Sequence, residues 1–567
     1  MDRDTKAKSI QKRMKQLEDG RSDYESLQKE VIKFILPQRY NYDRTQLKGQ
    51  KYGTSVYDGT PTSALNLFAD GLFGNLMNPA MRWFRLKLRK DFWRNKRISP
   101  TEKLDIQEWL DECEALMYSA FARSNIYEET PEFLRDGGSV GTATMYSEED
   151  LERDQTVFCT RHPGECYISE SKFGKVDTLY RKFKWPLHKI VERFGVDNLP
   201  ETIRGLVEPN QDQEYEIIHA TFPRGNIEVY FSDNGIRKQK RSNKFFPFES
   251  VYLLLDAAPS PHILSESGYK LFPYLVWRYR KNSDGGPYGE SPGQDALIDM
   301  YALNQIGRSM LIGAQKSVEP ALNVPEEMRG KVRLNPHGLN YYKDERRIIA
   351  PVDLVRQFSN AEYMEQRKRE AIEEHFKVKF FTMLYTAALE GRQLSVPQVL
   401  EMQGEKASQM STMVGRLVSE FFDPLIDRVW QIEYDAGRIP PPPPVLEGED
   451  IEVDYLGPLA QAQKKVFRIQ GIMQGAEMLK PFAETFPDVL DVVDPDVVAS
   501  EILDATGFPA KAIRPPDRVA KIRAERARQI QEEKQAALAL QAAQQVPNLS
   551  KRPEDGSPAE ALTGGER

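Results

Sequence analysis

Three residues with the side chains of metal ligands, Cys159, His162 and Cys166, follow a C-x2-H-x3-C spacing. Thiolates and imidazoles are the ligands that zinc prefers, but structural zinc sites normally have four of them. The sequence offers no fourth ligand at a suitable spacing. The alternative is a pair of β-segments around a turn at Pro163 and Gly164, and we favour it. We therefore expect no metal site and no other cofactor.

Nucleic-acid binding is the chemistry suggested by residues 82–97. Trp83, Phe84, Phe92 and Trp93 lie there among eight lysines and arginines. Base stacking combined with phosphate contact needs such a mixture. However, apolar and charged residues alternate in the first half of this stretch, which is typical of a strand with one buried face. The charges would then only form its solvated side, and we favour this second interpretation.

A more promising basic segment lies near the C-terminus. Residues 516–545 are predicted to form one charged helix, rich in alanine and glutamine, with little apolar face. The helix could contact DNA, or it could pack against copies of itself. Its candidate DNA-binding residues are Arg518, Lys521, Arg523, Arg526 and Arg528. Another basic run, at residues 237–241, is interpreted as a solvated hairpin.

Motifs for catalysis are missing from the sequence. It contains no G-x-x-x-x-G-K-[ST] phosphate loop, no H-E-x-x-H zinc motif and no G-x-S-x-G nucleophile elbow. A DNA-packaging motor must bind ATP, so the missing phosphate loop disfavours that class. Carboxylate pairs are frequent, but 85 acidic residues bring such pairs together by chance. We expect a protein that is not an enzyme.

Length and charge narrow the possibilities further. A chain of 567 residues is too long for one core and predicts several domains. The formal net charge is -7, whereas a protein that grips nucleic acid over its whole surface is usually basic. Any DNA contact should therefore be local. Three cysteines predict a reducing compartment and no disulfides. The sequence contains no long apolar run, so we expect neither a secretory signal nor a membrane-spanning helix.

Capping boxes mark the expected starts of four helices. In such a box a serine or threonine is followed three residues later by Glu or Gln, and the two side chains bind free amides of the first turn. Boxes begin at Ser99, Ser291, Ser359 and Ser395. The last three predict long helices over residues 291–316, 359–384 and 396–434.

Other elements follow from turn signals and periodicity. A turn at residues 58–61 leads into a helix expected over Ser63–Met77, with Thr60 as its cap and Pro61 at its first position. Residues 82–89 predict a strand, and residues 136–274 predict many short β-segments.

The C-terminal part changes character after five consecutive prolines at residues 440–444, which predict a stiff spacer. A strand is expected at 451–455, followed by helical segments at about 459–490 and 496–506. The polar residues 546–567 are expected to be flexible.

A series of short motifs runs in order from about Tyr57 to Gln529. They are Asn78-Pro79-Ala80-Met81-Arg82-Trp83-Phe84, Gly141-Thr142-Ala143, Phe272-Pro273-Tyr274, Tyr288-Gly289-Glu290-Ser291-Pro292, Leu303-Asn304, Gly415-Arg416-Leu417, Asp423-Pro424-Leu425-Ile426, Ala436-Gly437-Arg438-Ile439-Pro440-Pro441, Pro458-Leu459-Ala460-Gln461-Ala462-Gln463 and Gly507-Phe508-Pro509. In this order and spacing the chain resembles the podovirus-type head-to-tail connectors, or portal proteins, of bacteriophages. One departure is the box at Ser395, where these connectors often have Thr-x-x-Glu.

This resemblance implies an α+β fold, mainly α, with an α/β wing, a long-helix stem, a small α/β clip and a helical crown. The implied segments are the wing at 1–290, the stem helices at 291–316 and 359–384, the clip at 317–358, the channel loop at 385–395, a kinked wing helix with the proline spacer and strand at 396–455, the crown with a possible C-terminal barrel helix at 456–545, and a tail at 546–567.

The resemblance also implies a function as a non-catalytic conduit in the virion, at the capsid vertex. Its subunits would form a ring, expected to be a dodecamer, through which double-stranded DNA of any sequence is packaged and ejected. Implied partners are the terminase large subunit, tail adaptor proteins, and the major capsid and scaffolding proteins, with assembly in the host cytoplasm. The alternatives are a structural scaffold or minor capsid protein without a DNA channel, and, less favoured, an enzyme acting on nucleic acid.

Candidate site residues follow from these implied segments. The channel loop contributes Leu389, Glu390, Gly391, Arg392 and Gln393. The residues expected to face the channel from the stem are Glu362, Glu365, Arg369 and Glu373. The residues expected to dock terminase or adaptor from the clip are Arg329, Lys331, Arg333 and Arg346. Paired charges on a solvated helix would explain the stem residues equally well.

Overall fold

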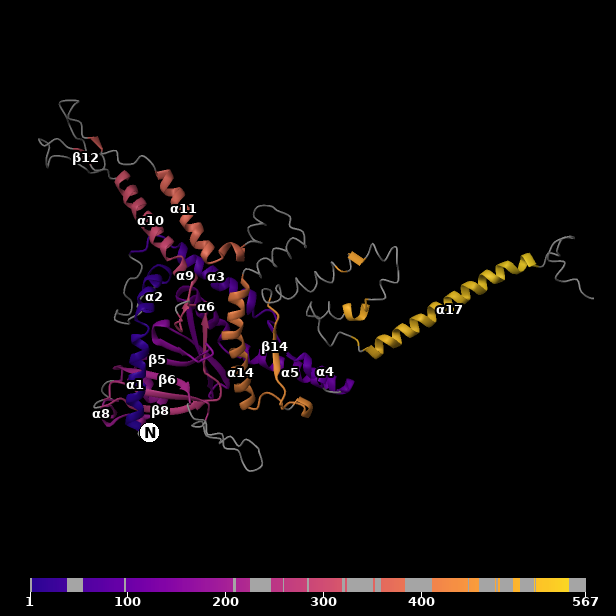
Figure 1. Ribbon diagram of the computed structural model, residues 1–567, viewed down its shortest axis with the longest axis horizontal. Helices are drawn as coiled ribbons and strands as arrows, with labels where there is room; N and C mark the ends of the chain where they lie inside the picture. Colours follow the sequence, from indigo (N-terminus) through magenta and orange to yellow (C-terminus); the bar gives the residue numbers. More distant parts are fainter. Residues whose placement is uncertain are drawn as a thin grey trace, which may run out of the picture. The chain divides into compact units, whose positions relative to one another are not determined.

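Two antiparallel sheets lie at the centre of the larger of two structural units in the computed structural model (Figure 1). The units are Met1–Val466 and Phe467–Arg567. The structure describes residues 3–37, 55–95, 98–207, 211–224, 246–257, 260–282, 285–318, 322–323, 350–351, 358–382, 410–446 and 448–457 of the first unit, and 475, 478–479, 493–499, 514 and 516–549 of the second.

The larger sheet has the strand order β4-β5-β6-β7-β8 and the smaller sheet the order β3-β2-β9. Their strands are β2 (Thr142–Asp150), β3 (Gln155–Arg161), β4 (Cys166–Glu170), β5 (Val176–Pro186), β6 (Glu214–Pro223), β7 (Phe248–Leu254), β8 (His262–Tyr269) and β9 (Tyr274–Arg278). The predicted β-rich region is confirmed, because all eight strands lie within or next to residues 136–274.

Helices cover both faces of the five-stranded sheet. Ile10 of α1 (Arg3–Asp19) belongs to the same buried cluster as Ile218, whereas Ile190 of α7 (Leu187–Phe194) belongs to the cluster of Ile217. Neighbouring residues of a strand point to opposite faces. The N-terminal helix and α7 therefore pack on opposite sides of β6. Short helices α8 (Glu201–Arg204), η2 (Pro163–Glu165) and η3 (Val196–Asn198) lie in the connections.

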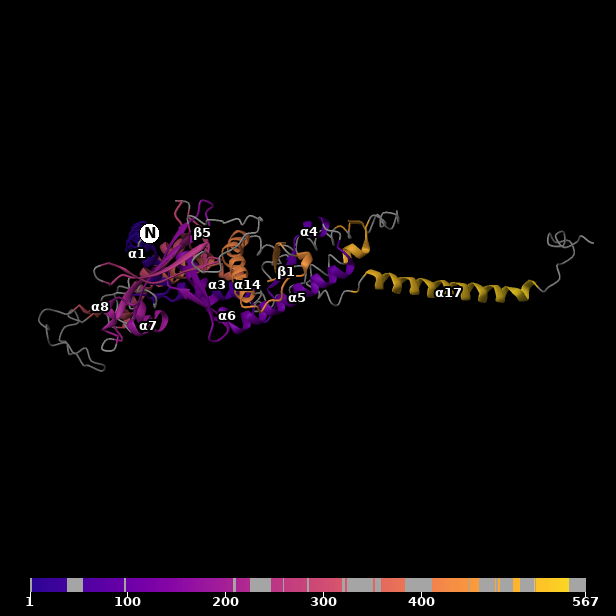
Figure 2. The same ribbon diagram turned by 90° about the horizontal axis from the view of Figure 1, so that it is seen from below.

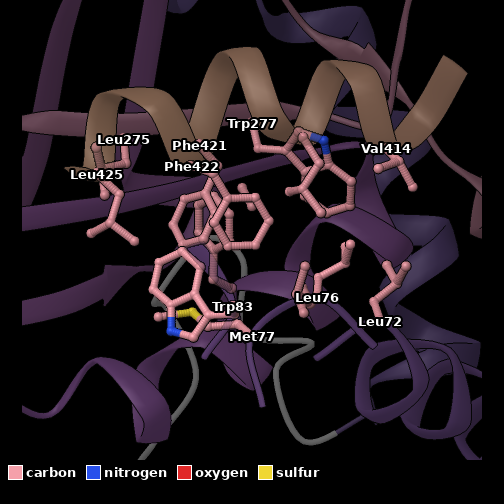
Figure 3. Close-up of a cluster of buried hydrophobic side chains, with 14 of the residues drawn as sticks. Leu72, Leu76, Met77, Trp83, Leu275, Trp277, Val414, Phe421, Phe422 and Leu425 are labelled. Atoms are coloured by element: carbon pink, nitrogen blue, oxygen red, sulfur yellow. The ribbon is translucent and has the colours of Figure 1, made fainter. Parts of the chain in front are cut away.

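The largest core gathers several helices around a short two-stranded sheet. These helices are α2 (Ser22–Ile35), α3 (Thr60–Leu76), α4 (Lys90–Asn95), α5 (Pro100–Arg123) and α6 (Ile126–Val140), and the sheet pairs β1 (Phe84–Leu88) with β14 (Ile451–Tyr455). Figure 3 shows Trp83, Trp277, Phe421 and Phe422 converging in this core. The Phe421 ring stacks on Phe133 with centroids 4.4 Å apart, so segments distant in sequence share one interior.

A helix from Met410 to Asp435 crosses this core (Figure 3) and contains a π-helical segment. The segment, η7, covers Val418–Phe422, and α14 (Asp423–Asp435) continues from it. A π turn contains one residue more than an α turn and usually appears as a local bulge. The predicted long helix thus exists over its described part, and η7 is its irregular point. The short helix η8 (Pro444–Leu446) follows.

Helices α10 (Leu297–Val318) and α11 (Phe358–His375) lie side by side and extend away from the sheets in Figure 1. Just before α10 come the short pair β10 (Arg280–Lys281) and β11 (Gly289–Glu290) and the helical turn α9 (Pro292–Asp295). Beyond α10, β12 (Leu322–Asn323) pairs with β13 (Ala350–Pro351). Two long helices were predicted at these places from their capping boxes. The cap at Ser359 was wrong, since α11 already includes Phe358. The expected end at residue 384 was also wrong, because α11 ends at His375 and Lys377 has a φ of +56°, which a helix does not allow.

The caps themselves give a mixed outcome. The boxes at Ser99 and Ser291 are present with both reciprocal hydrogen bonds. The cap at Thr60 was wrong, since Thr60 is the first residue of α3 and Gly59 occupies the cap position. Asp58 Oδ1 instead accepts from the Thr60 amide at 2.8 Å, because an aspartate two residues earlier reaches this amide directly. The box at Ser395 lies outside the described residues.

In the second unit the main element is α17 (Pro516–Leu549), which confirms the predicted charged helix and extends it by four residues (Figure 2). Across the parts of the chain that the structure describes, the fold is mixed helix and sheet, mainly helical, as expected. None of the described helices is both long and apolar enough to cross a membrane.

Candidate functional site: the paired helices and their anchors

Asp299 near the start of α10 joins the two projecting helices. Its Oδ1 lies 2.7 Å from Lys368 Nζ, and its Oδ2 lies 3.4 Å from His375 Nε2, both on α11. The Asp299 carboxylate thus contacts Lys368 and His375, which are seven residues, or about two helical turns, apart on α11. The start of α10 is therefore fixed against the end of α11, and the helices run antiparallel.

Asp58 fastens α11 to the rest of the unit. Its Oδ2 accepts from Arg369 Nε at 3.0 Å, while its Oδ1 accepts from the Thr60 amide at the start of α3. Burial alone would raise the pKa of Asp58, but the hydrogen bonds from Thr60 and Arg369 outweigh it and hold the pKa below its ordinary value. The carboxylate is ionised at neutral pH and links α11 to α3.

Asn304 fastens α10 to the same segment of chain. Its Oδ1 accepts from the Tyr57 amide at 2.9 Å, and its Nδ2 donates to the Ser55 carbonyl at 3.0 Å. The side-chain amide pairs with the backbone as a neighbouring strand would. Residues 55–58 therefore act as a strap that contacts α10 through Asn304 and α11 through Asp58.

The predicted channel-facing residues divide into two groups. Glu365 and Arg369 form an ion pair within α11, at 2.6 Å, and Arg369 also binds Asp58. These two side chains lie on the side of α11 that faces α3. Glu362 is exposed and Glu373 is half-buried. The structure thus brings Arg369 and Glu365 into an internal network and leaves Glu362 open to solvent.

A second network anchors the π-helical segment. Arg278, only 2% exposed at its side chain, binds Glu420 of η7 and Glu170 of β4, and Lys281 lies 3.0 Å from Glu170. Arg416 contacts Glu420 at 3.3 Å. Burial lowers the pKa of Arg278, but the bonds to the two glutamates outweigh it and raise the pKa above its ordinary value. The ion pairs with the two glutamates offset the free-energy cost of burying the charged Arg278 side chain.

A close backbone contact between Gly141 and Gly289 explains two of the short motifs on which the resemblance rests. Gly141 has a φ of +83°, and a side chain there would meet the Gly289 carbonyl oxygen at 2.2 Å. The Gly289 amide donates to Thr142 Oγ1 at 2.8 Å, and Ser291 Oγ donates to the Ser139 carbonyl at 2.7 Å. The motif at 141–143 and the motif at 288–292 are thus two sides of one contact, directly below the first projecting helix.

The aromatic residues of the stretch at 82–97 are structural. Trp83, Phe84 and Phe92 are buried in the main core. On the other side of β1, Lys87 pairs with Asp454 at 2.8 Å and Arg89 with Glu452 at 3.3 Å, both residues of β14. Buried rings cannot stack on bases, and paired cations attract phosphate weakly. The favoured interpretation, a strand with one buried face, is confirmed.

The metal-ligand spacing also has a structural explanation. Cys159 is in β3 and Cys166 in β4, which belong to different sheets. His162 Nδ1 accepts from the Gly164 amide at 3.0 Å and so caps the turn between them. Among the residues that the structure describes, no three His, Cys, Asp or Glu side chains are arranged to hold a metal ion.

A fully buried histidine lies between the two sheets, and no pattern in the sequence singled it out. His219 Nδ1 lies 2.6 Å from the Tyr274 hydroxyl, Nε2 lies 2.9 Å from Ser250 Oγ, and the ring stacks on Tyr252 at 4.0 Å. Burial, reinforced by Arg181 and other nearby arginines, lowers the pKa of His219 well below its ordinary value. The imidazole is therefore neutral and serves as a structural hydrogen-bonding group.

The basic helix of the second unit keeps most of its cations exposed. Arg523 forms an ion pair with Asp496 at 2.5 Å. All five candidate DNA-binding residues are exposed, namely Arg518, Lys521, Arg523, Arg526 and Arg528. The predicted channel loop at 385–395, the clip residues Arg329, Lys331, Arg333 and Arg346, and the basic run at 237–241 lie outside the described residues.

Sequence reasoning missed the anchoring residues Asp58, Asn304, Arg278 and Glu420 as functional positions. Asp58 lies in the predicted turn at residues 58–61, and Asn304 lies in the two-residue motif Leu303-Asn304, but neither was predicted to anchor a helix. Arg278 and Glu420 carried no signal, because an ion pair between residues 142 positions apart leaves no local pattern.

Comparison with known proteins gives consistent matches along the chain. Residues 7–513 match the family model described as bacteriophage head to tail connecting protein. The portal protein of Salmonella phage epsilon15 is 28% identical over 561 residues, covering 96% of each chain. The probable portal protein of Bordetella phage BPP-1 is 29% identical over 574 residues, covering 99% of this chain and 98% of its own. The chain, with its strapped helix pair and buried anchors, belongs to the family of bacteriophage head-to-tail connecting proteins, the portal proteins.

Proposed function

We propose that this chain is the subunit of a ring, expected to be a dodecamer, whose central channel passes double-stranded DNA during packaging and ejection. The supporting observation is the family match, which extends over residues 7–513 and includes the whole of the helix pair α10 and α11. A family that connects head to tail, with near-full-length relatives named portal proteins, fits a structural conduit better than an enzyme.

The geometry supports particular roles for the segments. The helix pair α10 and α11 would form the stem, and the sheets and helices up to about residue 290 the wing. Residues 317–358 would form the clip, residues 385–395 the channel loop, and residues 456–545 the crown. The helix containing η7 leads from the proposed loop back into the main core, where Arg278 and Glu420 hold it.

Charge on α11 is compatible with passage of any DNA sequence. Its exposed residues include Glu362, Glu370 and Glu374 together with Arg367. A surface with both signs offers few uncompensated cations for phosphates, so it would not hold the duplex tightly. DNA contact would then be made mainly by the proposed loop, through Arg392 and Gln393, and by the exposed cations of α17.

Partners follow from this role. The terminase large subunit would dock during packaging and tail adaptors afterwards, both at the proposed clip. Major capsid and scaffolding proteins would surround the ring at the capsid vertex, and assembly would take place in the host cytoplasm.

Electron microscopy of the purified chain, combined with mass from light scattering, tests the proposal. Rings with a central hole and a mass near twelve times 65.1 kDa are expected. A chain that stays monomeric at every salt and protein concentration would contradict the ring. Phage heads assembled with a shortened 385–395 segment should package DNA but retain it poorly, and normal retention would contradict the loop assignment.

A further inference from the structure

The face of α10 that points away from α11 is almost free of charge. From Leu297 to Gln315 the helix has only two side chains that are charged at neutral pH, Asp299 and Arg308. Asp299 is directed to α11, where it binds Lys368. On the outer face Ile298 is 79% exposed and Ile312 is 40% exposed. Such a face is unusual on a helix that water surrounds, since solvated helices normally carry charged residues there.

Three of the exposed apolar residues of α10 form a stripe. Ile298, Tyr301 and Ile312 are spaced by three and eleven residues, which places them on one side of a helix, and exposed Gln305 and Arg308 lie among them. The Tyr301 ring also contacts Phe34 of α2 edge-on, with centroids 4.9 Å apart. The stripe from Ile298 to Ile312 is about 21 Å long at 1.5 Å per residue. A row of exposed apolar side chains of this length indicates a surface that another protein covers.

Helix α11 has the opposite character. Between Phe358 and His375 it contains eight Asp, Glu, Lys or Arg residues. Its exposed apolar residues are adjacent and lie near its outer end, Tyr363 at 65% and Met364 at 54%. The Arg367 guanidinium lies over the Tyr363 ring, 5.8 Å from its centroid. The two helices of one pair therefore present two different surfaces, one a long stripe whose charged residue is Arg308 and one a short apolar patch within charged residues.

These two surfaces lie at a similar height on the helix pair. Asp299 bonds to both Lys368 and His375, so it is level with about residue 371 of α11. Thirteen residues further out, Ile312 is level with about residue 358, and Tyr363 lies within about 8 Å of that level along the axis. A neighbouring copy in the same orientation could therefore bring its Tyr363 patch to the end of the stripe without a large shift along the helices.

We infer that the α10 stripe is covered by α11 of the next copy of this chain, so that Ile312 of one subunit contacts Tyr363 and Met364 of its neighbour. Contacts between two different surfaces of identical subunits repeat around an axis and can close into a ring, whereas contacts of a surface with itself give only dimers. The inference rests on the proposed ring and adds which residues hold neighbouring subunits together along the helix pair.

The consequence for the charged residues is specific. If the α10 stripe is buried between subunits, the residues left on the open sides of the pair are mainly those of α11, among them Glu362 and Glu370. The solvent-facing surface of the assembled helices would then be charged, while each seam between subunits would be largely apolar. This arrangement matches the composition of interface cores, which are depleted in charge.

Disulfide trapping tests the contact directly. In a Cys159→Ser background, which removes the partly exposed native thiol, Ile312→Cys is combined with Tyr363→Cys. After mild oxidation, a denaturing gel without reductant should show a ladder of covalent multiples of the chain. Each single variant should remain at the mass of one chain, because a heterologous contact never brings two identical positions together.

Three outcomes would overturn the inference, and they are distinguishable. Intact rings by microscopy without a ladder would leave the proposed function standing and remove this contact. Dimers in either single variant would show a self-complementary contact. Monomers throughout would contradict the ring and this contact together.

A second measurement avoids dependence on disulfide geometry. The double variant Ile298→Asp, Ile312→Asp should lower the mass measured by light scattering from ring to monomer. The circular dichroism spectrum should remain that of the folded chain, since both side chains are exposed in one subunit. The matched control is Leu151→Asp, an apolar residue that is 84% exposed in the turn after β2. This control should still form rings, and rings that persist equally in both variants would contradict the inference.

Discussion

Arg278 donates to both oxygens of the Glu420 carboxylate, from its backbone amide to Oε2 at 2.9 Å and from Nη2 to Oε1 at 2.5 Å. Arg278 ends β9, an outer strand of the three-stranded sheet, and Glu420 lies within η7. One side chain of the π-helical segment therefore satisfies the open edge of a strand and also neutralises its buried cation. The long helix is positioned against the sheet through this pair.

Replacing Glu420 by glutamine should destabilise the protein strongly. The neutral side chain keeps its shape but leaves the buried Arg278 with one carboxylate, Glu170, in place of two. Breaking a buried pair in this way costs about 3 kcal/mol. Thermal unfolding of E420Q should therefore show a clearly lower melting temperature. Arg416→Ala is the control, because this residue contacts the same carboxylate from a more exposed position and should cost well under about 1 kcal/mol. Equal effects of the two changes would contradict the role given to Arg278.

Replacing Asp58 by asparagine should loosen the helix pair at its strap. Arg369 is partly exposed, so the loss of its ion pair and of the charged cap on α3 should cost about 1 kcal/mol in total. The lowered pKa of Asp58 also predicts a pH dependence. Its stabilising contribution is present above the ordinary value of 3.8 and is lost as the pH falls through the lower folded value. Melting curves between pH 7 and pH 3 should thus converge for the wild type and D58N, and parallel curves would contradict this assignment.

His219 should make the chain sensitive to mild acid. Because its pKa in the folded protein lies well below the ordinary 6.5, the unfolded chain binds a proton first. The contribution of the neutral ring to stability is full above about pH 6.5 and decreases as the pH falls below that value. Protonation inside the fold is opposed by burial and by Arg161, Arg181 and Arg193.

A matched variant isolates this effect. His219→Gln keeps a neutral hydrogen-bonding side chain that does not titrate, so it should be less stable than the wild type at pH 7.5 but should lose less stability between pH 7.5 and pH 5.5. The comparison of melting temperatures at both pH values is the measurement. Equal losses in the two proteins would show that other groups cause the acid sensitivity.

Gly141→Ala should be among the most damaging single substitutions. The positive φ disfavours any side chain, and the added carbon would meet the Gly289 carbonyl, which is backbone and cannot swing aside. A cost of more than about 2 kcal/mol is expected, measured as a fall in melting temperature or in soluble yield. Gly59→Ala provides the control, because its φ is negative and no atom lies within 4 Å. A similar loss in both variants would contradict the proposed close contact.

Local sequence patterns were sufficient to predict many of the helices and strands. The capping boxes at Ser99 and Ser291 involve residues three positions apart, so the sequence alone revealed them. The alternation in β1 likewise predicted its buried face, although not that β14, more than 350 residues later, is its partner. The cap at Thr60 failed for a local reason, because α3 begins one residue earlier than expected and includes Thr60, whose amide is bound by Asp58.

The anchors of the helix pair are contacts between residues far apart in sequence, which local sequence patterns do not reveal. Arg369 binds Asp58 across 311 residues, and Tyr57 binds Asn304 across 247 residues. Each of these side chains looks like an ordinary surface residue in its own segment. The projecting helices could therefore be predicted, but not the strap that holds them or the division of their charges between internal pairs and solvent.

The π-helical segment has a consequence for comparing members of this family. A π turn holds one residue more than an α turn, so the chain has in effect an inserted residue between Leu417 and Asp423. A relative whose helix is regular at this place should align with the present chain only if a one-residue gap is opened there. Without that gap, either Met413 and Val414 on one side or Leu425 and Ile426 on the other would be compared with positions that point in a different direction.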